Sequence, residues 1–195
     1  MLSLPPLAGL VLAGGASSRM GVDKSLIEWH GKPQWMHLKE LMESLGLQAF
    51  VSVAKAPSEA DYFLEDLHAN IGPMGGIYTA MKRHPQHAWL VVACDLPLVD
   101  REVLEWLISY RERGVSSVSC IGPGNFPEPL FSIWEPELLP VLDAKIEQKN
   151  YRLSGALEWG NALHPVCPWP EKLSNINTPD DRQKIQQNMR FNKYN

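Results

Sequence analysis

Short, nearly continuous apolar runs that alternate with helix-like stretches constrain the fold of this chain more than any other feature. Residues 7–13 (LAGLVLA) and 88–94 (AWLVVAC) are typical of strands buried on both faces of a parallel sheet. Between them, residues 33–45 have helical hydrophobic spacing, with Pro33 suited to the first turn and Gly46 to the stop. Strands that alternate with helices predict an α/β fold, in which helices cover both faces of a mostly parallel sheet.

The remaining segments extend this pattern along the chain. Further strands are predicted at residues 49–54, 115–120 and 130–134, and further helices at 74–83, 101–113, 136–148 and 179–189. The composition has no low-complexity tract, internal repeat or break that would suggest a domain boundary. We therefore expect one domain over residues 1–190, followed by a frayed polar tail at 191–195.

Composition excludes several classes of protein. The 195 residues are 45% hydrophobic and 21% charged, as in folded globular proteins, and the formal net charge of −4 argues against a nucleic-acid or membrane-surface binder. No apolar run approaches the ~20 residues that span a bilayer, and the basic start of a secretory signal is missing. Three distant cysteines favour a reducing compartment over a disulfide framework. We therefore expect a cytoplasmic protein.

The most informative stretch is a glycine turn that follows the first predicted strand, residues 12–24 (LAGGASSRMGVDK). Gly14 and Gly15 let the backbone approach a ligand closely, and successive N–H groups in such a turn can bind an anion. Arg19 and Lys24 add positive charge. The stretch is neither a Walker A loop nor a G-x-G-x-x-G motif, and the alternative is a solvated turn. The combination favours a polyphosphate site.

Asp95 is the second candidate group, because it directly follows the strand predicted at 88–94. In open α/β sheets, ligands bind outside the carboxyl ends of the strands, where the glycine turn also lies. A carboxylate there suits Mg²⁺, which prefers one or two carboxylates together with phosphate oxygens and water. The alternative is that Asp95 is only a turn residue. We expect Asp95 and Lys24 to face a shared cavity.

The glycine turn closely resembles the G-G-x-x-x-R-M-G-x-D-K signature of nucleotidyltransferases, and more specifically of the molybdenum cofactor guanylyltransferase family. Three further blocks are similar to that family's motifs: Ala93-Cys94-Asp95-Leu96-Pro97, Gly72-Pro73-Met74-Gly75-Gly76 and Asn175-Ile176-Asn177-Thr178-Pro179. The resemblance covers nearly the whole chain. It implies a single-domain, three-layer, Rossmann-like nucleotidyltransferase fold.

The resemblance also implies a reaction. In it, GTP and molybdenum-loaded molybdopterin, with Mg²⁺, give the guanine dinucleotide form of the cofactor and pyrophosphate. Asp95 would bind the metal, and Arg19 and Lys24 would contact the phosphates. The nucleotide would be held by Leu12, Ala13, Gly14, Gly15, Lys24, Asp66 and Asp95, with Asp66 on the guanosine side. A molybdoenzyme or an upstream cofactor-synthesis protein is the partner that the family implies.

The sequence indicates fewer residues for the acceptor-binding side of the site than for the nucleotide side. The pterin pocket is expected across the carboxyl edge, lined partly by residues 126–163, with Asn177 and Arg152 as candidates. For Asn177 the alternative is a helix cap, and for Arg152 a solvated side chain. Glu128 stands where relatives often have histidine, and no asparagine stands near residues 52–54, where the family pattern contacts the nucleotide.

Two alternatives to the guanylyl transfer remain open at this point. The first is transfer of another nucleotide, such as CMP to the same pterin or a nucleotide to a sugar phosphate. The second is a non-catalytic nucleotide-binding or cofactor-chaperone module. Gly14 favours GTP over CTP as the donor, because cytidylyl-transferring relatives tend to have alanine at this position.

Overall fold

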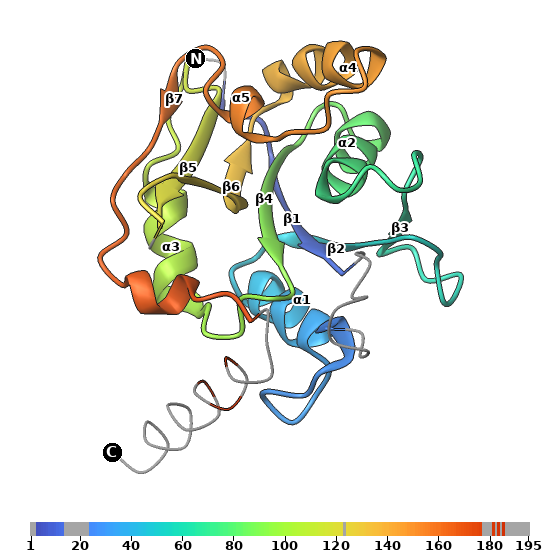
Figure 1. The fold of residues 1–195 in the computed structure, drawn as a ribbon, viewed down its shortest axis with the longest axis vertical. Coiled ribbons are helices and arrows are strands. Elements are labelled where there is room, and N and C mark those ends of the chain that lie inside the picture. Colours follow the sequence, from blue (N-terminus) through green and yellow to red (C-terminus); the bar gives the residue numbers. More distant parts are fainter. Residues whose placement is uncertain are drawn as a thin grey trace.

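The computed structural model describes residues 3–13, 24–122, 124–176 and positions 181, 183 and 185. Within these residues, seven strands form one sheet in the order β3-β2-β1-β4-β6-β5-β7 (Figure 1). The strands are β1 (Leu7–Leu12), β2 (Gln48–Val53), β3 (Phe63–Glu65), β4 (Ala88–Ala93), β5 (Ser117–Ile121), β6 (Pro127–Trp134) and β7 (Ala162–Leu163).

The sheet is mostly parallel, as the alternating sequence pattern predicts. Strand β1 lies between β2 and β4 and runs parallel to both. Only β6 runs the other way, antiparallel to β4 and to β5. This reversal follows from the short connection between β5 and β6, since antiparallel neighbours can be joined by a tight turn whereas parallel neighbours need a crossover.

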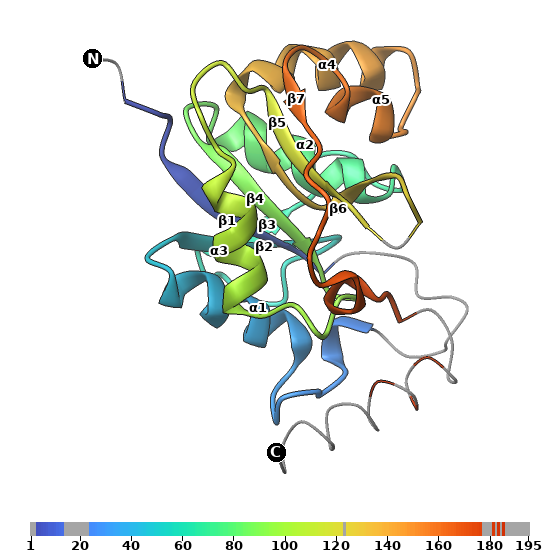
Figure 2. The same cartoon turned by 90° about the vertical axis from the view of Figure 1, so that its left-hand side faces the viewer.

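Helices cover both faces of the sheet, which gives three layers (Figure 2). On one face, α1 (Gln34–Ser44) and α3 (Arg101–Ser109) pack against the sheet, and on the other face α2 (Pro73–Arg83), α4 (Leu139–Glu147) and α5 (Ser154–Leu157) do so. Strand β4 is buried along its whole length, as expected for a central strand with helices on both sides. Three short 3₁₀ helices complete the described elements: η1 (Lys24–Leu26), η2 (Pro136–Leu138) and η3 (Pro170–Leu173).

The structure departs from the sequence prediction in its shortest elements. Strands β3 and β7 and helix α5 span only two to four residues, too few for a periodic pattern to reveal them. Helix α3 ends four residues before the predicted Arg113, and Arg111 instead pairs with the buried Glu135. Of the helix predicted at 179–189, the structure describes only three positions, all helical, and the tail at 191–195 lies outside the described residues.

The carboxyl ends of four parallel strands meet at one edge of the sheet. Ala13 N donates to Ser52 O (3.1 Å), and Cys94 N donates to Leu12 O (3.2 Å). Asp66 follows β3 and donates its backbone N–H to Val53 O (3.0 Å). These bonds continue the sheet by one residue past each strand, so the segments that leave β1, β3 and β4 start at the same edge of the sheet. No helix in the described part of the chain is long and apolar enough to cross a membrane.

Candidate active site

Four of the residues singled out from the sequence lie at this carboxyl edge. Leu12 ends β1 and Ala13 follows it, while Asp95 lies two residues beyond the β4 partner of Leu12, Ala93. Asp66 directly follows β3, two strands away from β1 on the other side. The predicted nucleotide side and the predicted metal side are therefore parts of one edge, with the end of β1 between them.

Asp66 is held by its neighbour strand and faces the start of α2. Ser52 Oγ donates to Asp66 Oδ1 (2.8 Å). A Cβ atom on Gly75 would lie 3.2 Å from Asp66 Oδ2, and one on Gly76 would lie 2.2 Å from Ser52 Oγ. The two glycines thus allow the first turn of α2 to approach the Ser52–Asp66 pair more closely than any larger residue could. This is the physical role of the Gly72-Pro73-Met74-Gly75-Gly76 block.

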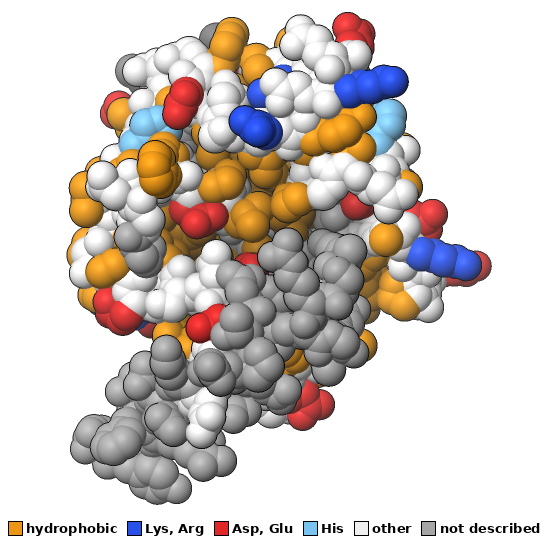
Figure 3. All heavy atoms as spheres, viewed as in Figure 1, with side chains coloured by type: hydrophobic (Ala, Val, Ile, Leu, Met, Phe, Trp, Pro, Cys, Tyr) orange, Lys and Arg blue, Asp and Glu red, His pale blue; other side chains and the backbone are white. Residues whose placement is uncertain are grey.

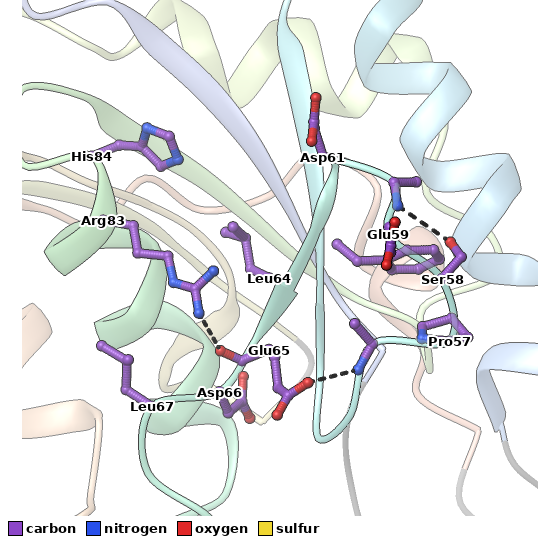
Figure 4. A pocket seen from close by; sticks show the side chains of 13 residues that line it. Pro57, Ser58, Glu59, Asp61, Leu64, Glu65, Asp66, Leu67, Arg83 and His84 are labelled. Atoms are coloured by element: carbon purple, nitrogen blue, oxygen red, sulfur yellow. Dashed lines mark hydrogen bonds between the residues drawn. The ribbon is translucent and has the colours of Figure 1, made fainter.

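The carboxyl group of Asp66 is partly desolvated. Burial raises its pKa above the ordinary value, and the hydrogen bond from Ser52 acts in the opposite direction. Asp66 also lies in the wall of a pocket of about 950 Å³ beside the edge strand β3. Figure 4 shows it next to Glu65, at the end of the pocket away from His84. A polar ligand group that donates hydrogen bonds would offset the desolvation of this carboxylate.

Asp95 lies in a turn that the C-terminal segment reaches. Ile176 N donates to Asp95 O (3.0 Å), and the Ile176 side chain is buried. The contact places the Asn175-Ile176 part of the N-x-N-T-P block directly beside the Asp95 turn. Asn177 itself lies outside the described residues, so its predicted role stays a prediction.

A second carboxylate, that of Glu128 near the start of β6, lies within electrostatic range of Asp95. Burial raises the pKa of Glu128, and the charge of Asp95 raises it further, while a hydrogen bond from Leu130 N to Glu128 Oε1 (3.2 Å) lowers it. The described residues contain no group of three or more metal-ligating side chains. A site of one or two carboxylates nevertheless fits Mg²⁺, which takes its other ligands from phosphate oxygens and water.

The surface at this edge is hollowed. Figure 3 shows a depression between the regions of α2 and α5, with a floor of hydrophobic side chains and acidic side chains at its margin. Phe126, on the hairpin that leads into β6, is 76% exposed. Arg152 is exposed in the loop between α4 and α5, and only its backbone N–H has a described hydrogen bond, to Asn150 (3.4 Å). The described contacts therefore do not join Arg152 to Asp66 or Asp95.

Gly14, Gly15 and Arg19 lie outside the described residues, and so does the side chain of Lys24, whose backbone begins η1. The shared cavity expected for Lys24 and Asp95 stays a prediction.

Sequence reasoning missed the role of Ser52. The sequence shows only that an expected asparagine is absent near this position, whereas the structure shows that the Ser52 hydroxyl orients Asp66. Its location on β2, opposite Leu12 in the parallel register, is the signal that could have indicated it. His30 and Gln34, which bond to the turn after Asp95, carried no recognisable signal.

The layered, mostly parallel sheet has the α/β fold of solved nucleotidyltransferases. A nucleotidyl transferase from Methanothermobacter has the same fold, with a TM-score of 0.74 at 16% identity over 94% of this chain and 97% of that one. The chain belongs to the family of MobA-like NTP transferase domains, whose family model matches residues 9–163.

Individual relatives resemble almost the entire chain. A molybdenum cofactor guanylyltransferase from Pseudomonas putida is 35% identical over 189 residues, which cover 93% of this chain and 98% of that protein. The crystal structure of molybdopterin-guanine dinucleotide biosynthesis protein A from Archaeoglobus fulgidus superposes with a TM-score of 0.76. The two are 25% identical, and the match covers 92% of this chain and 97% of that one.

Proposed function

We propose that this protein transfers GMP from GTP to the phosphate of molybdenum-loaded molybdopterin and releases pyrophosphate. The observation that carries the proposal is the convergence of Leu12, Ala13, Asp66 and Asp95 on one carboxyl edge of the sheet. The relatives named molybdenum cofactor guanylyltransferase and molybdopterin-guanine dinucleotide biosynthesis protein A, which are similar over nine-tenths of this chain, support GTP as the donor and molybdopterin as the acceptor.

The reaction is a substitution at the α-phosphorus of GTP. An oxygen of the acceptor phosphate forms a bond to this phosphorus, and the bond from it to the bridging oxygen of the β-phosphate breaks. The electron pair leaves with pyrophosphate. Because the acceptor phosphate is already ionised near neutral pH, no general base is needed. The barrier comes mainly from bringing anions together, so positioning and electrostatic stabilisation carry the catalysis.

On this proposal, each part of the edge has its own task. The turn that begins at Leu12 and Ala13 binds the triphosphate through its N–H groups, with Arg19 on the β- and γ-phosphates and Lys24 toward the α-phosphate. Asp66 accepts hydrogen bonds from the guanosine part of GTP. Asp95, with Glu128 nearby, would hold Mg²⁺, which when bound neutralises phosphate charge and orients the leaving pyrophosphate.

We place the acceptor in the depression between the regions of α2 and α5. Its hydrophobic floor suits a flat pterin ring, and the exposed Phe126 is available to stack on it. Arg152 remains a candidate for the acceptor phosphate. We infer a cytoplasmic setting, in which a molybdoenzyme or an upstream cofactor protein exchanges the bound cofactor.

A coupled pyrophosphate-release assay tests the proposal. With molybdenum-loaded molybdopterin and Mg²⁺, GTP should support turnover, and CTP, ATP and UTP should support much less. A thermal-shift series with the four nucleotides should show the largest increase for GTP, because a ligand that binds only the folded state stabilises it. Preferred turnover of CTP would replace guanylyl by cytidylyl transfer, and nucleotide binding without pyrophosphate release would indicate a non-catalytic module.

Substitution of Asp95 tests the metal site. We expect Asp95→Asn to lower kcat on the order of 100-fold or more, because phosphate charge is no longer neutralised where it develops. Mn²⁺ binding in the presence of GTP, followed by electron paramagnetic resonance, should weaken in parallel. Glu105→Gln, which removes an exposed carboxylate on α3, is the matched control and should change neither kcat nor Mn²⁺ binding. Wild-type metal binding in Asp95→Asn would contradict the assignment.

A further inference from the structure

The turn that carries Asp95 is held by two separate parts of the chain through three hydrogen bonds, each to a different carbonyl. Ile176 N from the C-terminal segment donates to Asp95 O (3.0 Å). Gln34 Nε2 from the start of α1 donates to Leu96 O (3.4 Å). His30 Nε2 donates to Pro97 O (3.0 Å). Three consecutive backbone carbonyls are thus fixed by contacts that are distant in sequence.

His30 and Gln34 belong to the segment that starts at Lys24, and this segment is internally bonded. Residues Glu28 and Pro33 pair in an isolated antiparallel bridge, and Gln34 N donates to Ile27 O (3.1 Å). The backbone that leaves η1 is therefore connected, through these bonds, to both side chains that reach the Asp95 turn.

The His30 ring is held in place by a second histidine. His30 and His37 stack with their ring centroids 3.7 Å apart and their planes within 15°. Burial, together with the charges of His30 and Lys32, lowers the pKa of His37 to about 4. At neutral pH His37 is therefore uncharged, which permits the close stacking. Since a carbonyl oxygen can only accept, His30 must carry its proton on Nε2 to bond to Pro97.

Gln34 is an unusual residue for its surroundings. Its side chain is completely buried, next to the equally buried Leu96, and its Oε1 atom accepts no hydrogen bond from the described residues. An unsatisfied buried acceptor costs free energy, so packing alone would favour leucine at this position. Unlike leucine, the Gln34 amide can donate a hydrogen bond, from its Nε2 atom to Leu96 O.

We infer that His30 and Gln34 are positioning residues, which fix the segment that follows Lys24 against the turn that carries Asp95. The inference rests on the proposed function, in which Lys24 and Asp95 act on the same triphosphate. Neither side chain needs to touch the substrate. Their effect is to keep the backbone that follows Lys24 and the turn that carries Asp95 at a constant separation and orientation, as transfer between two anions requires.

Two substitutions of His30 provide a matched pair. His30→Phe keeps an aromatic ring that can stack on His37 but removes the donor to Pro97 O, whereas His30→Gln keeps a donor. We expect His30→Phe to lower kcat about 10- to 100-fold with only a severalfold rise in the KM for GTP, because loss of alignment affects the transition state more than substrate binding. Mn²⁺ affinity in the presence of GTP should also fall severalfold. His30→Gln should restore both values to within about threefold of the wild type.

Substitution of Gln34 separates positioning from stability. Gln34→Leu removes the unsatisfied Oε1 atom together with the donor, so its melting temperature should equal or exceed that of the wild type. Its kcat should nevertheless fall about tenfold. A purely structural residue would not show turnover and stability changing in opposite directions.

The outcomes distinguish this inference from the proposed function. If Asp95→Asn loses turnover while His30→Phe and Gln34→Leu keep wild-type kcat and Mn²⁺ affinity, the positioning role is wrong and the proposed function stands. If Asp95→Asn keeps wild-type turnover, the proposed metal site is wrong, whatever the other variants do. A loss of kcat in His30→Phe that His30→Gln does not restore would also overturn the inference, since the donor would then be irrelevant.

Discussion

At the scale of single residues, two opposing effects determine how readily Asp66 ionises. Burial disfavours its ionised form, and the hydroxyl of Ser52 favours it. Since the pKa is raised overall, the folded protein binds the Asp66 proton more tightly than the unfolded chain does. Ionisation of Asp66 therefore costs stability, and this cost appears as the pH rises from the unfolded pKa, near 3.8, through the raised pKa of the folded state.

Asp66→Asn should accordingly be more stable than the wild type at pH 8, and the difference should shrink as the pH is lowered toward 4.5. The neutral amide keeps an oxygen that can accept from Ser52, so the local hydrogen bond persists. Turnover should fall about tenfold, because a charged acceptor on the guanosine side is lost. Urea unfolding at several pH values measures the first effect. An Asn variant that is less stable than the wild type at pH 8 would contradict the raised pKa.

At the scale of elements, the start of α2 is shaped by its contact with the site. Gly72 precedes the helix with a φ of 66°, which favours glycine, and Pro73 occupies the first turn. At Gly76 this first turn packs against Leu12 and Ser52 without any intervening side chain. This close approach sets the position of Asp66 between β2, β3 and α2.

Gly76→Ala tests whether that approach is required. The new Cβ would lie 2.2 Å from Ser52 Oγ and 2.8 Å from Leu12 Cδ2, so the helix or the strand end must shift. We expect a loss of about 1–3 kcal/mol in unfolding free energy, more than the ~1 kcal/mol gained from helix propensity, together with reduced turnover. Gly155→Ala in α5 is the control, because its Cβ would make only an ordinary 3.5 Å contact with Lys145 Nζ and should be tolerated.

Which parts of the structure can be predicted from the sequence depends on how far apart along the chain the interacting residues lie. Strands β1 and β4, and the place of Asp95 after β4, follow from local pattern and from the geometry of parallel sheets. The two-residue β7 carries no such pattern. The Ser52–Asp66 bond and the contact from His30 to Pro97 join positions 14 and 67 residues apart, so they depend on tertiary packing that no sequence window contains.

On the scale of the whole molecule, the two edges of the sheet have different tasks. The carboxyl edge gathers the candidate site, whereas the amino edge is fastened by a buried ion pair between Arg111 and Glu135. The Arg111 side chain is 8% exposed and that of Glu135 is 3% exposed. Arg111 Nη2 also donates to Pro5 O (2.6 Å), so one guanidinium connects the segment before β1, the end of α3 and the end of β6.

Arg111→Ala should therefore destabilise the protein strongly without changing its chemistry. Removal of one partner leaves the Glu135 carboxylate buried and uncompensated, which costs about 3–5 kcal/mol of unfolding free energy. Below the transition temperature, kcat and KM should stay within about twofold of the wild type, because the pair lies at the edge opposite Asp95. The double variant Arg111→Met/Glu135→Leu should recover most of the loss, since an apolar pair needs no charge compensation. Chemical denaturation with parallel kinetics measures both effects, and a large drop in kcat of the folded Arg111→Ala protein would show that the two edges are coupled.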